Sequence, residues 1–288
     1  MNIRFHLPIL LLALLAFGLP HQARAADSYD GCTGFITSLP AIISTQGIWC
    51  FNQSLTTSAT SGNAITINTN NVTIDCNHFR LDGSAAGTGT AAIGIYAGSR
   101  VKVTVRRCAI SGYYVGAKLT GSGHVVDGNV FNGNTSIGLV IDASSAKNAS
   151  MVQDNQVLNT GGSTLIGTVY GIWAHQSVDV LGNTVSGVTA RSTSNGNAFG
   201  IYTTGTSYGA SVRDNHVHNL NKDGTGLVYG IYNDTSSHVI LRNNDVSATG
   251  SVGLYCSSGN SAARDNVTHD FTTSISNCND VTGNFHTP

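Results

Sequence analysis

The sequence contains no glutamate, only four lysines and four prolines, and charged residues fill just 10% of its 288 positions. An ordinary soluble domain has about 25% charged residues. Surface helices depend on glutamate, lysine and arginine, so this scarcity excludes a helical bundle or a coiled coil. The formal net charge of −1 lacks the basic excess of a general nucleic-acid binder. We therefore expect no nucleic-acid partner.

Apolar residues and turn formers are plentiful instead. Hydrophobic residues make up 41% of the chain, which is too much for a disordered protein. Glycine occurs 34 times and asparagine 27 times, and both residues favour turns. This composition predicts a folded, turn-rich, mostly β protein.

The first 25 residues have the pattern of a secretory signal peptide. Arg4 precedes an apolar run from Leu7 to Leu19, and Ala23-Arg24-Ala25 supplies an A-x-A cleavage site. The run is shorter than the roughly 20 apolar residues that span a bilayer. We expect residues 1–25 to be removed, no membrane anchor to remain after cleavage, and the protein to be secreted or periplasmic.

All six cysteines follow the predicted cleavage site. An even number in an exported protein predicts three disulfides. No two cysteines form a C-x-x-C pair, so a zinc site or a thioredoxin-like motif has little support. The cysteines are Cys32, Cys50, Cys76, Cys108, Cys256 and Cys278.

Two short patterns alternate along the chain. The first is a glycine between two apolar residues, repeated at Gly94, Gly116, Gly138, Gly171, Gly200, Gly230 and Gly253. The second is a short β-type run followed by an asparagine, repeated at Asn129, Asn155, Asn183, Asn215, Asn244, Asn266 and Asn284. Asn77 and Cys108 take the same place upstream. A repeat of about 22 residues cannot bury its own apolar face, but stacked repeats can.

The asparagine column indicates how the repeats stack. Asparagine side chains in equivalent turns can bond to the backbone and to each other, and asparagine tolerates left-handed turn geometry. The natural arrangement is a stack of about nine parallel coils spaced at about 4.8 Å. The alternative is a β-sandwich with accidental spacing, which has no reason to keep one asparagine in every turn. We predict an all-β, single-stranded parallel β-helix, or solenoid.

Residues 65–285 resemble the right-handed parallel β-helix proteins of the pectate-lyase-like superfamily. The resemblance is carried by the repeats, by their opening from Ala64 to Ile67 and from Asn71 to Cys76, and by the upstream block from Cys32 to Cys50. It implies an N-terminal disulfide-linked cap over residues 26–64 and a β-helix domain over residues 65–288. The superfamily contains lyases, hydrolases, epimerases and sugar-binding modules, so the fold does not select an activity.

Stacked coils also select a cysteine pairing. Cys32 and Cys50 are neighbours in the cap, and Cys76 and Cys108 occupy nearly equivalent turns. Cys256 and Cys278 lie near the same strand of the last two full coils. The predicted disulfides are therefore Cys32–Cys50, Cys76–Cys108 and Cys256–Cys278.

Strand alternation sorts the columns beside the glycines by face. Tyr170, Phe199 and Tyr229 are expected inside, and the glycines outside. The next outward column holds Trp173, Tyr202, Tyr232 and Tyr255, and the one after it holds His175 and Asp234. Aligned aromatic rings can stack on the apolar face of a sugar while histidine and aspartate bond its hydroxyls. The alternative is a structural ladder that covers the glycine backbone.

Three long loops precede these aromatic strands, at residues 159–168, 188–198 and 219–227. Insertions on one side of a solenoid often build its binding face. We expect them to form a wall beside the aromatic column. The alternative is loop growth that the fold simply tolerates.

An arginine column offers a different chemistry. Superfamily lyases use an arginine or lysine base and often Ca²⁺ held by aspartates, so Arg213, Asp214 and Arg242 are the catalytic candidates, with Ca²⁺ only in that case. A surface lattice of arginine and aspartate is the favoured interpretation. His216 and His218 lie on one side of a strand and can chelate a metal weakly, but surface histidines are favoured, and we expect no metal site or cofactor.

Three functions follow. The first is a protein that binds, and processes if it is an enzyme, a polysaccharide or oligosaccharide along the aromatic column. The second is a lyase of acidic glycans with an arginine base. The third is a non-catalytic structural or adhesive rod. Whether the protein is an enzyme stays open, and a polysaccharide lyase or glycoside hydrolase is the class expected if it is.

Overall fold

The computed structural model describes residue 29 and residues 31–143, 149–205, 209–235 and 238–287. The predicted signal peptide lies outside the described residues and stays a prediction. Within these ranges, none of the helical segments combines the length and the apolar character needed to cross a membrane.

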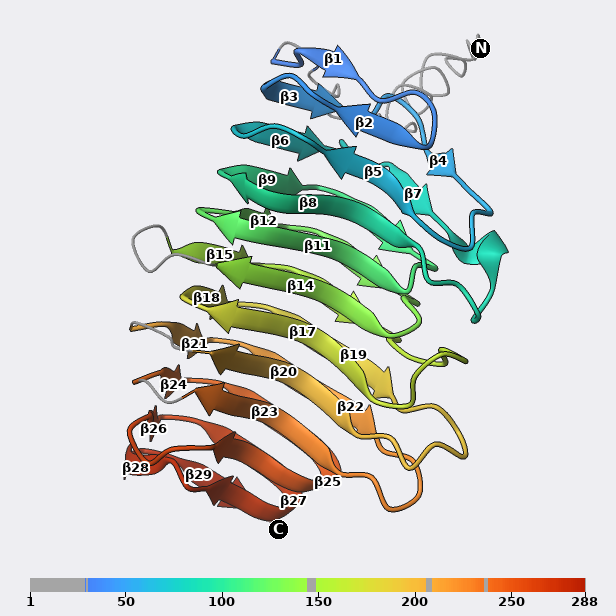
Figure 1. Cartoon of the computed structure of the whole chain (residues 1–288). Helices are drawn as coiled ribbons and strands as arrows, with labels where there is room; N and C mark the ends of the chain where they lie inside the picture. The colour runs from blue at the N-terminus through green and yellow to red at the C-terminus, as the bar shows by residue number, and fades with distance from the viewer. Residues whose placement is uncertain (1–28, 30, 144–148, 206–208, 236–237, 288) are drawn as a thin grey trace, which may run out of the picture. The chain divides into compact units, whose positions relative to one another are not determined.

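The described chain winds through three faces, and every strand pairing is parallel (Figure 1). The first face consists of β1 (Gly34–Phe35), β3 (Gly47–Cys50), β6 (Val72–Asp75), β9 (Val103–Arg106), β12 (Val125–Asp127), β15 (Ser150–Gln153), β18 (Val178–Leu181), β21 (Ser211–Arg213), β24 (Ile240–Arg242), β26 (Ala262–Arg264) and β28 (Asn279–Thr282). The second face consists of β4 (Leu55–Thr56), β7 (Arg80–Asp82), β10 (Ala109–Ser111), β13 (Val130–Asn132), β16 (Gln156–Leu158), β19 (Thr184–Thr189), β22 (His216–Asn221), the first parts of β25 (Asp245–Cys256) and β27 (Val267–Ser276), and β29 (Phe285–Thr287).

The third face completes each coil. It consists of β2 (Ala41–Ile43), β5 (Asn63–Ile67), β8 (Ile93–Val101), β11 (Val115–Ser122), β14 (Ile137–Ala143), β17 (Val169–Gln176), β20 (Ala198–Gly205), β23 (Val228–Thr235) and the last parts of β25 and β27. A single turn of 3₁₀-helix, η1 (Ser84–Ala86), lies in the loop before β8. One aliphatic or aromatic column per face fills the interior, as with Val180, Val185 and Ile172 of one coil, all fully buried. The predicted parallel β-helix is confirmed.

The asparagine ladder is confirmed in atomic detail. The Asn155 side-chain amide donates to Asn183 Oδ1 at 3.0 Å and to the Val126 carbonyl at 2.9 Å. The Asn155 backbone N–H donates to the same Asn183 Oδ1 at 3.0 Å. The pattern continues through Asn215, Asn244 and Asn266 to Asn284. Each coil is therefore bonded to the next through a buried amide as well as through its strands.

The residue before each ladder asparagine has a left-handed backbone. Asp154, Asp214, Asn243 and Asp265 have φ between 52° and 60°. Aspartate and asparagine tolerate this conformation better than most residues. The polar row beside the arginine column therefore has a conformational cause.

The repeated glycines point inward, which makes the expected outward column wrong. A Cβ atom on Gly171 would lie 2.5 Å from Val185 Cγ1 and 2.5 Å from the carbonyl oxygen of Gly200. Val185 belongs to the interior. Glycine is required here because the next coil's backbone and a core side chain occupy the place of a side chain.

All three predicted disulfides are present: Cys32–Cys50, Cys76–Cys108 and Cys256–Cys278. Their Cα atoms are 5.8, 4.7 and 4.9 Å apart, respectively. β2 and β3, in the segment predicted as a cap, pair in parallel with β5 and β6. The disulfides thus join neighbouring turns near both ends of the stack.

Candidate functional site

The outer side of the third face carries seven aromatic rings on adjacent strands. We call Tyr170, Trp173, Phe199, Tyr202, Tyr229, Tyr232 and Tyr255 the aromatic surface. Trp173, Tyr202, Tyr232 and Tyr255 lie in register across β17, β20, β23 and β25, as predicted. Their neighbouring ring centroids are 4.5–5.6 Å apart, and all four residues are partly exposed.

The second aromatic column also lies outside, so the predicted inward stack of Tyr170, Phe199 and Tyr229 is wrong. The Tyr170 ring stacks on Trp173 and on Phe199, with centroids 5.0 Å apart in both pairs. Gly171 interrupts the strict alternation, because Val169 and Ile172 both point inward although they are three positions apart. The interruption turns two aromatic columns to the same side and joins them into one surface.

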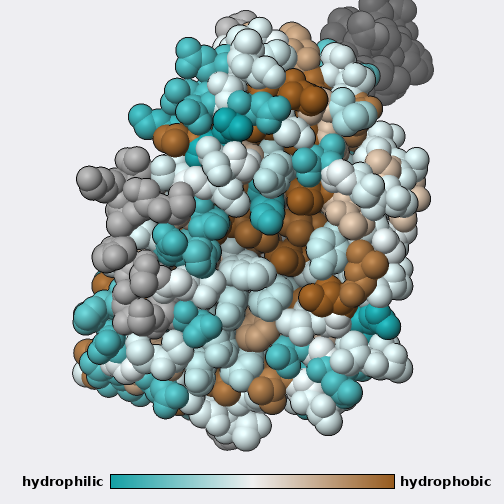
Figure 2. All heavy atoms as spheres, in the orientation of Figure 1, coloured by the Kyte–Doolittle hydropathy of each residue, from teal (hydrophilic) through white to brown (hydrophobic). Residues whose placement is uncertain are grey.

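A groove of about 380 Å³ adjoins the aromatic surface at Trp173. Its apolar side is formed by Tyr114, Val115, Ile137 and Val140, and its polar side by Lys118, Thr120, Asp142 and His175. Figure 2 shows apolar residues gathered on this face over β11 and β14. The groove thus offers apolar contact and hydrogen-bonding groups side by side.

Two of the predicted polar residues have defined partners on this face. His175 Nδ1 lies 2.7 Å from Asp142 Oδ1, and both side chains are about one-third exposed, at 33% and 35%. Tyr202 donates its hydroxyl to Asp234 Oδ2 at 3.1 Å. The indole N–H of Trp173 is buried and has no hydrogen-bond partner in the described chain. Asp142 contacts His175 and Asp234 contacts Tyr202, so the two aspartates do not form a carboxylate pair.

The apolar lining and Lys118 were not singled out from the sequence. Lys118 and Val140 belong to the same outward column as Trp173, and Asp142 belongs to that of His175. The sequence pattern assigns these groove residues to the columns, but only the aromatic residues of a column have an obvious ligand chemistry. The groove arises where the column changes from aromatic to aliphatic residues.

The Tyr202 hydroxyl provides a pH test of this geometry. Burial and the hydrogen bond to Asp234 raise the pKa of Tyr202 to about 12, from an ordinary value of 10.0. The unfolded chain ionises near pH 10, so the neutral hydroxyl contributes stability that is complete below pH 10 and is lost as the pH rises toward 12. Absorbance titrations of tyrosinate in the parent and in Tyr202→Phe should differ by one group that titrates near pH 12. If the group that Tyr202→Phe removes titrates near pH 10 instead, the hydrogen bond between Tyr202 and Asp234 is contradicted.

The three predicted loops stack on one another. Arg191 N donates to the Gly167 carbonyl at 3.2 Å, and Asp223 N donates to the Gly196 carbonyl at 3.2 Å. Leu227 N donates to Asn197 Oδ1 at 2.8 Å. The loops carry exposed apolar side chains at Leu165, Ile166 and Leu227. They form a continuous layer that leads directly into the strands of the aromatic surface.

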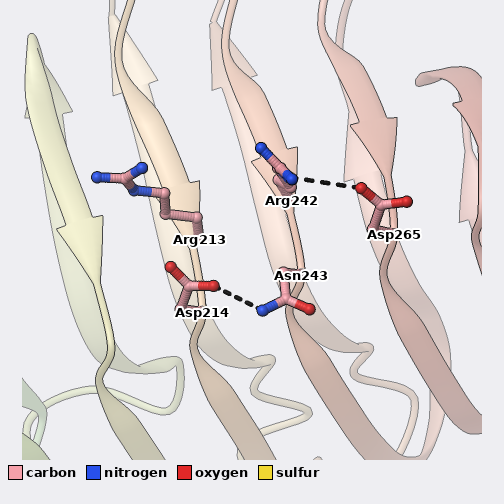
Figure 3. Close-up of a pocket in the computed structure, with 5 residues that line it drawn as sticks. All are labelled: Arg213, Asp214, Arg242, Asn243 and Asp265. Atoms are coloured by element: carbon pink, nitrogen blue, oxygen red, sulfur yellow. Dashed lines mark hydrogen bonds and ion pairs between the residues drawn. The ribbon is translucent and has the colours of Figure 1, made fainter.

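The arginine candidates lie together on the first face, which is a different side of the coil. Arg213, Asp214, Arg242, Asn243 and Asp265 line a hollow of about 420 Å³ (Figure 3). Asn243 Nδ2 donates to Asp214 Oδ1 at 2.6 Å, and Arg242 Nε lies 3.4 Å from Asp265 Oδ2. Within the described ranges, no three histidine, cysteine or carboxylate side chains are arranged to hold a metal ion. The hollow is a lattice of arginine, asparagine and aspartate on strand ends and left-handed turns.

His216 and His218 lie on the second face, as neighbours on β22. Burial, reinforced by the adjacent His216, lowers the pKa of His218. This pair is separate from the groove that contains His175.

No family model and no curated protein matches this sequence. Two solved structures are similar in fold. The Dettilon tailspike protein superposes with a TM-score of 0.52 at 15% identity over 82% of this chain, which spans only 47% of the tailspike. The Azotobacter vinelandii mannuronan C-5 epimerase AlgE4 A-module gives a TM-score of 0.47 at 13% identity, over 88% of this chain and 86% of that one. The likeness to the tailspike, at this identity, concerns the right-handed parallel β-helix fold alone.

Proposed function

We propose that this right-handed parallel β-helix is a secreted or periplasmic protein that binds polysaccharide on the third face. The observation that carries the proposal is the aromatic surface, in which seven rings on four adjacent strands are in mutual contact and all but Phe199, which is 7% exposed, are partly exposed. The disulfides support a location outside the reducing cytoplasm.

The chemistry of the face suits a sugar chain. A pyranose ring has an apolar C–H face and a polar rim, so aromatic rings supply contact area and neighbouring polar groups supply direction. Here the polar groups are the Asp142–His175 pair, Lys118 in the groove, and the Tyr202–Asp234 pair within the surface. The six strands from β11 to β25 span about 24 Å at the usual strand spacing, which favours an extended ligand over a single sugar.

Catalysis has less support than binding. Arg213, Asp214 and Arg242 share one hollow, but Asp214 is engaged by Asn243, and Asp265 by Arg242 and Arg264. The left-handed turns account for the polar residues beside them. We therefore propose ligand binding on the third face, and a lyase reaction at the arginine column is the second hypothesis.

A double variant tests the proposal. Affinity electrophoresis through gels that contain neutral or acidic polysaccharides should show retardation of the parent protein. Trp173→Ala/Tyr202→Ala should weaken that retardation at least tenfold, because it removes two of the partly exposed rings of the aromatic surface.

The matched control is Phe285→Ala, which removes an exposed aromatic ring on the second face (57% exposed). It should be retarded like the parent. Equal retardation of the double variant and the parent, or no retardation by any gel, would contradict the proposal. A large fall in the melting temperature of the double variant would favour the structural ladder.

A further inference from the structure

A pair of histidines on the second face forms a chemical group unrelated to the aromatic surface. His216 and His218 are two positions apart on β22, so both side chains extend from the outer side of the strand. Their ring centroids are 4.4 Å apart and their planes are inclined by 33°. Two imidazoles are thus held next to each other by a rigid strand.

A carboxylate from the next coil completes the group. Asp245 is the register partner of His216 in the β22–β25 pairing. Asp245 Oδ2 lies 3.7 Å from His216 Nε2. Two ligands of one tetrahedral zinc ion, each at about 2.0–2.1 Å from the metal, are about 3.3 Å apart. The two atoms are therefore close to the spacing that a shared metal ion imposes.

One nitrogen of the pair has no partner. His218 Nδ1 is buried and makes no hydrogen bond within the described chain. A buried polar atom without a partner is uncommon in proteins and calls for an explanation. The outer members of the group stay accessible, since the side chains of His216 and Asp245 are 50% and 55% exposed.

We infer that His216, His218 and Asp245 bind a divalent transition metal, with water in the remaining positions. Imidazole and carboxylate are the ligand types of zinc sites, and imidazole also suits copper and nickel. As they lie in the described structure, the three side chains do not form a metal-binding arrangement, so binding requires rotation of the exposed His216 and Asp245 side chains. The strand register, which fixes their Cα atoms, does not have to change.

Zinc titration of the untagged protein tests the inference. Isothermal titration calorimetry with zinc chloride should show one saturable site per chain. His216→Ala and His218→Ala should each weaken zinc binding at least tenfold, and Asp245→Asn should weaken it by about tenfold. If an alanine variant fails to fold, His216→Gln or His218→Gln removes the ligand at similar size.

The matched control is His238→Ala, which removes an exposed histidine just before β24. It should keep the zinc affinity of the parent. Absence of zinc binding in the parent would overturn the inference, and so would unchanged affinity in His216→Ala and His218→Ala. Loss of the site in His238→Ala alone would overturn it as well. Polysaccharide retardation should be unaffected by His216→Ala, so failure here is distinguishable from failure of the proposed function.

Discussion

Asn183→Leu should lower the free energy of unfolding by about 4 kcal/mol, because each buried polar group left without a partner costs about 1–3 kcal/mol. The Asn183 amide donates to the carbonyls of Val152 and Leu181 and to Asn215 Oδ1, all at 3.0 Å. Its oxygen accepts two hydrogen bonds from Asn155. Leucine has a similar shape but fills none of these roles. Urea unfolding followed by circular dichroism measures the loss.

The control for this variant is the same substitution at an exposed position. Asn132 is exposed on β13 and accepts one hydrogen bond, from Asn159. Asn132→Leu should change stability by about 0.5 kcal/mol or less, as is usual for surface substitutions. Equal unfolding midpoints for Asn183→Leu and Asn132→Leu would show that the ladder does not stabilise the stack.

Gly200→Ala should destabilise the protein by about 3 kcal/mol, the upper range for overpacking a core. Its Cβ atom would lie 2.4 Å from Val217 Cγ1 and 2.5 Å from the Gly230 carbonyl oxygen. The backbone oxygen belongs to the next coil and cannot move without breaking strand pairing. The same urea experiment measures this effect.

Gly259→Ala is the matched control, since the nearest atom to its added Cβ would be the Asn277 oxygen at 3.9 Å. It should unfold close to the parent. If Gly200 pointed outward, as strict strand alternation predicts, the protein would tolerate Gly200→Ala as well as it tolerates Gly259→Ala. A small effect of Gly200→Ala would therefore restore the outward column and remove the reason for the merged aromatic surface.

The fold could be predicted because its signals are periodic. The asparagine at each turn has one structural role, because the side-chain amide of every member from Asn129 to Asn266 donates to Oδ1 of the next member. The disulfides followed because stacking places equivalent turns side by side. For the asparagines and the cysteines alike, the residue that the local repeat pattern indicates is the residue that the stacked coils need at that place.

The side on which Tyr170, Phe199 and Tyr229 lie could not be predicted by alternation. Alternation assumes a regular pleat, in which every second side chain faces the core. Each inward glycine breaks this rule, because two apolar residues that are three positions apart on its strand then both face the core. The close approach of Gly171 to the Gly200 carbonyl depends on the neighbouring coil, which the sequence of a single strand does not specify. The groove at Trp173 was missed because its lining combines residues of three coils.

The arginine column shows the opposite case, in which a suggestive pattern has a conformational explanation. Asp214 is a catalytic candidate in the sequence, but it occupies a left-handed turn position, as does Asp265. Backbone angles of this kind are not visible from residue spacing. Arg213 and Arg242 belong to one column in the sequence, and the structure pairs them in register on β21 and β24.

Protection of Trp173 from acrylamide quenching tests the central claim most directly. The chain has two tryptophans, Trp49 and Trp173, so Trp49→Phe leaves Trp173 as the single tryptophan, which can be excited selectively over the tyrosines. Titration with the polysaccharide that retards the parent protein should reduce quenching of Trp173 in a saturable way. The midpoint should match the affinity from electrophoresis. Unchanged quenching at polysaccharide concentrations that fully retard the protein would place the ligand elsewhere and contradict binding on the aromatic surface.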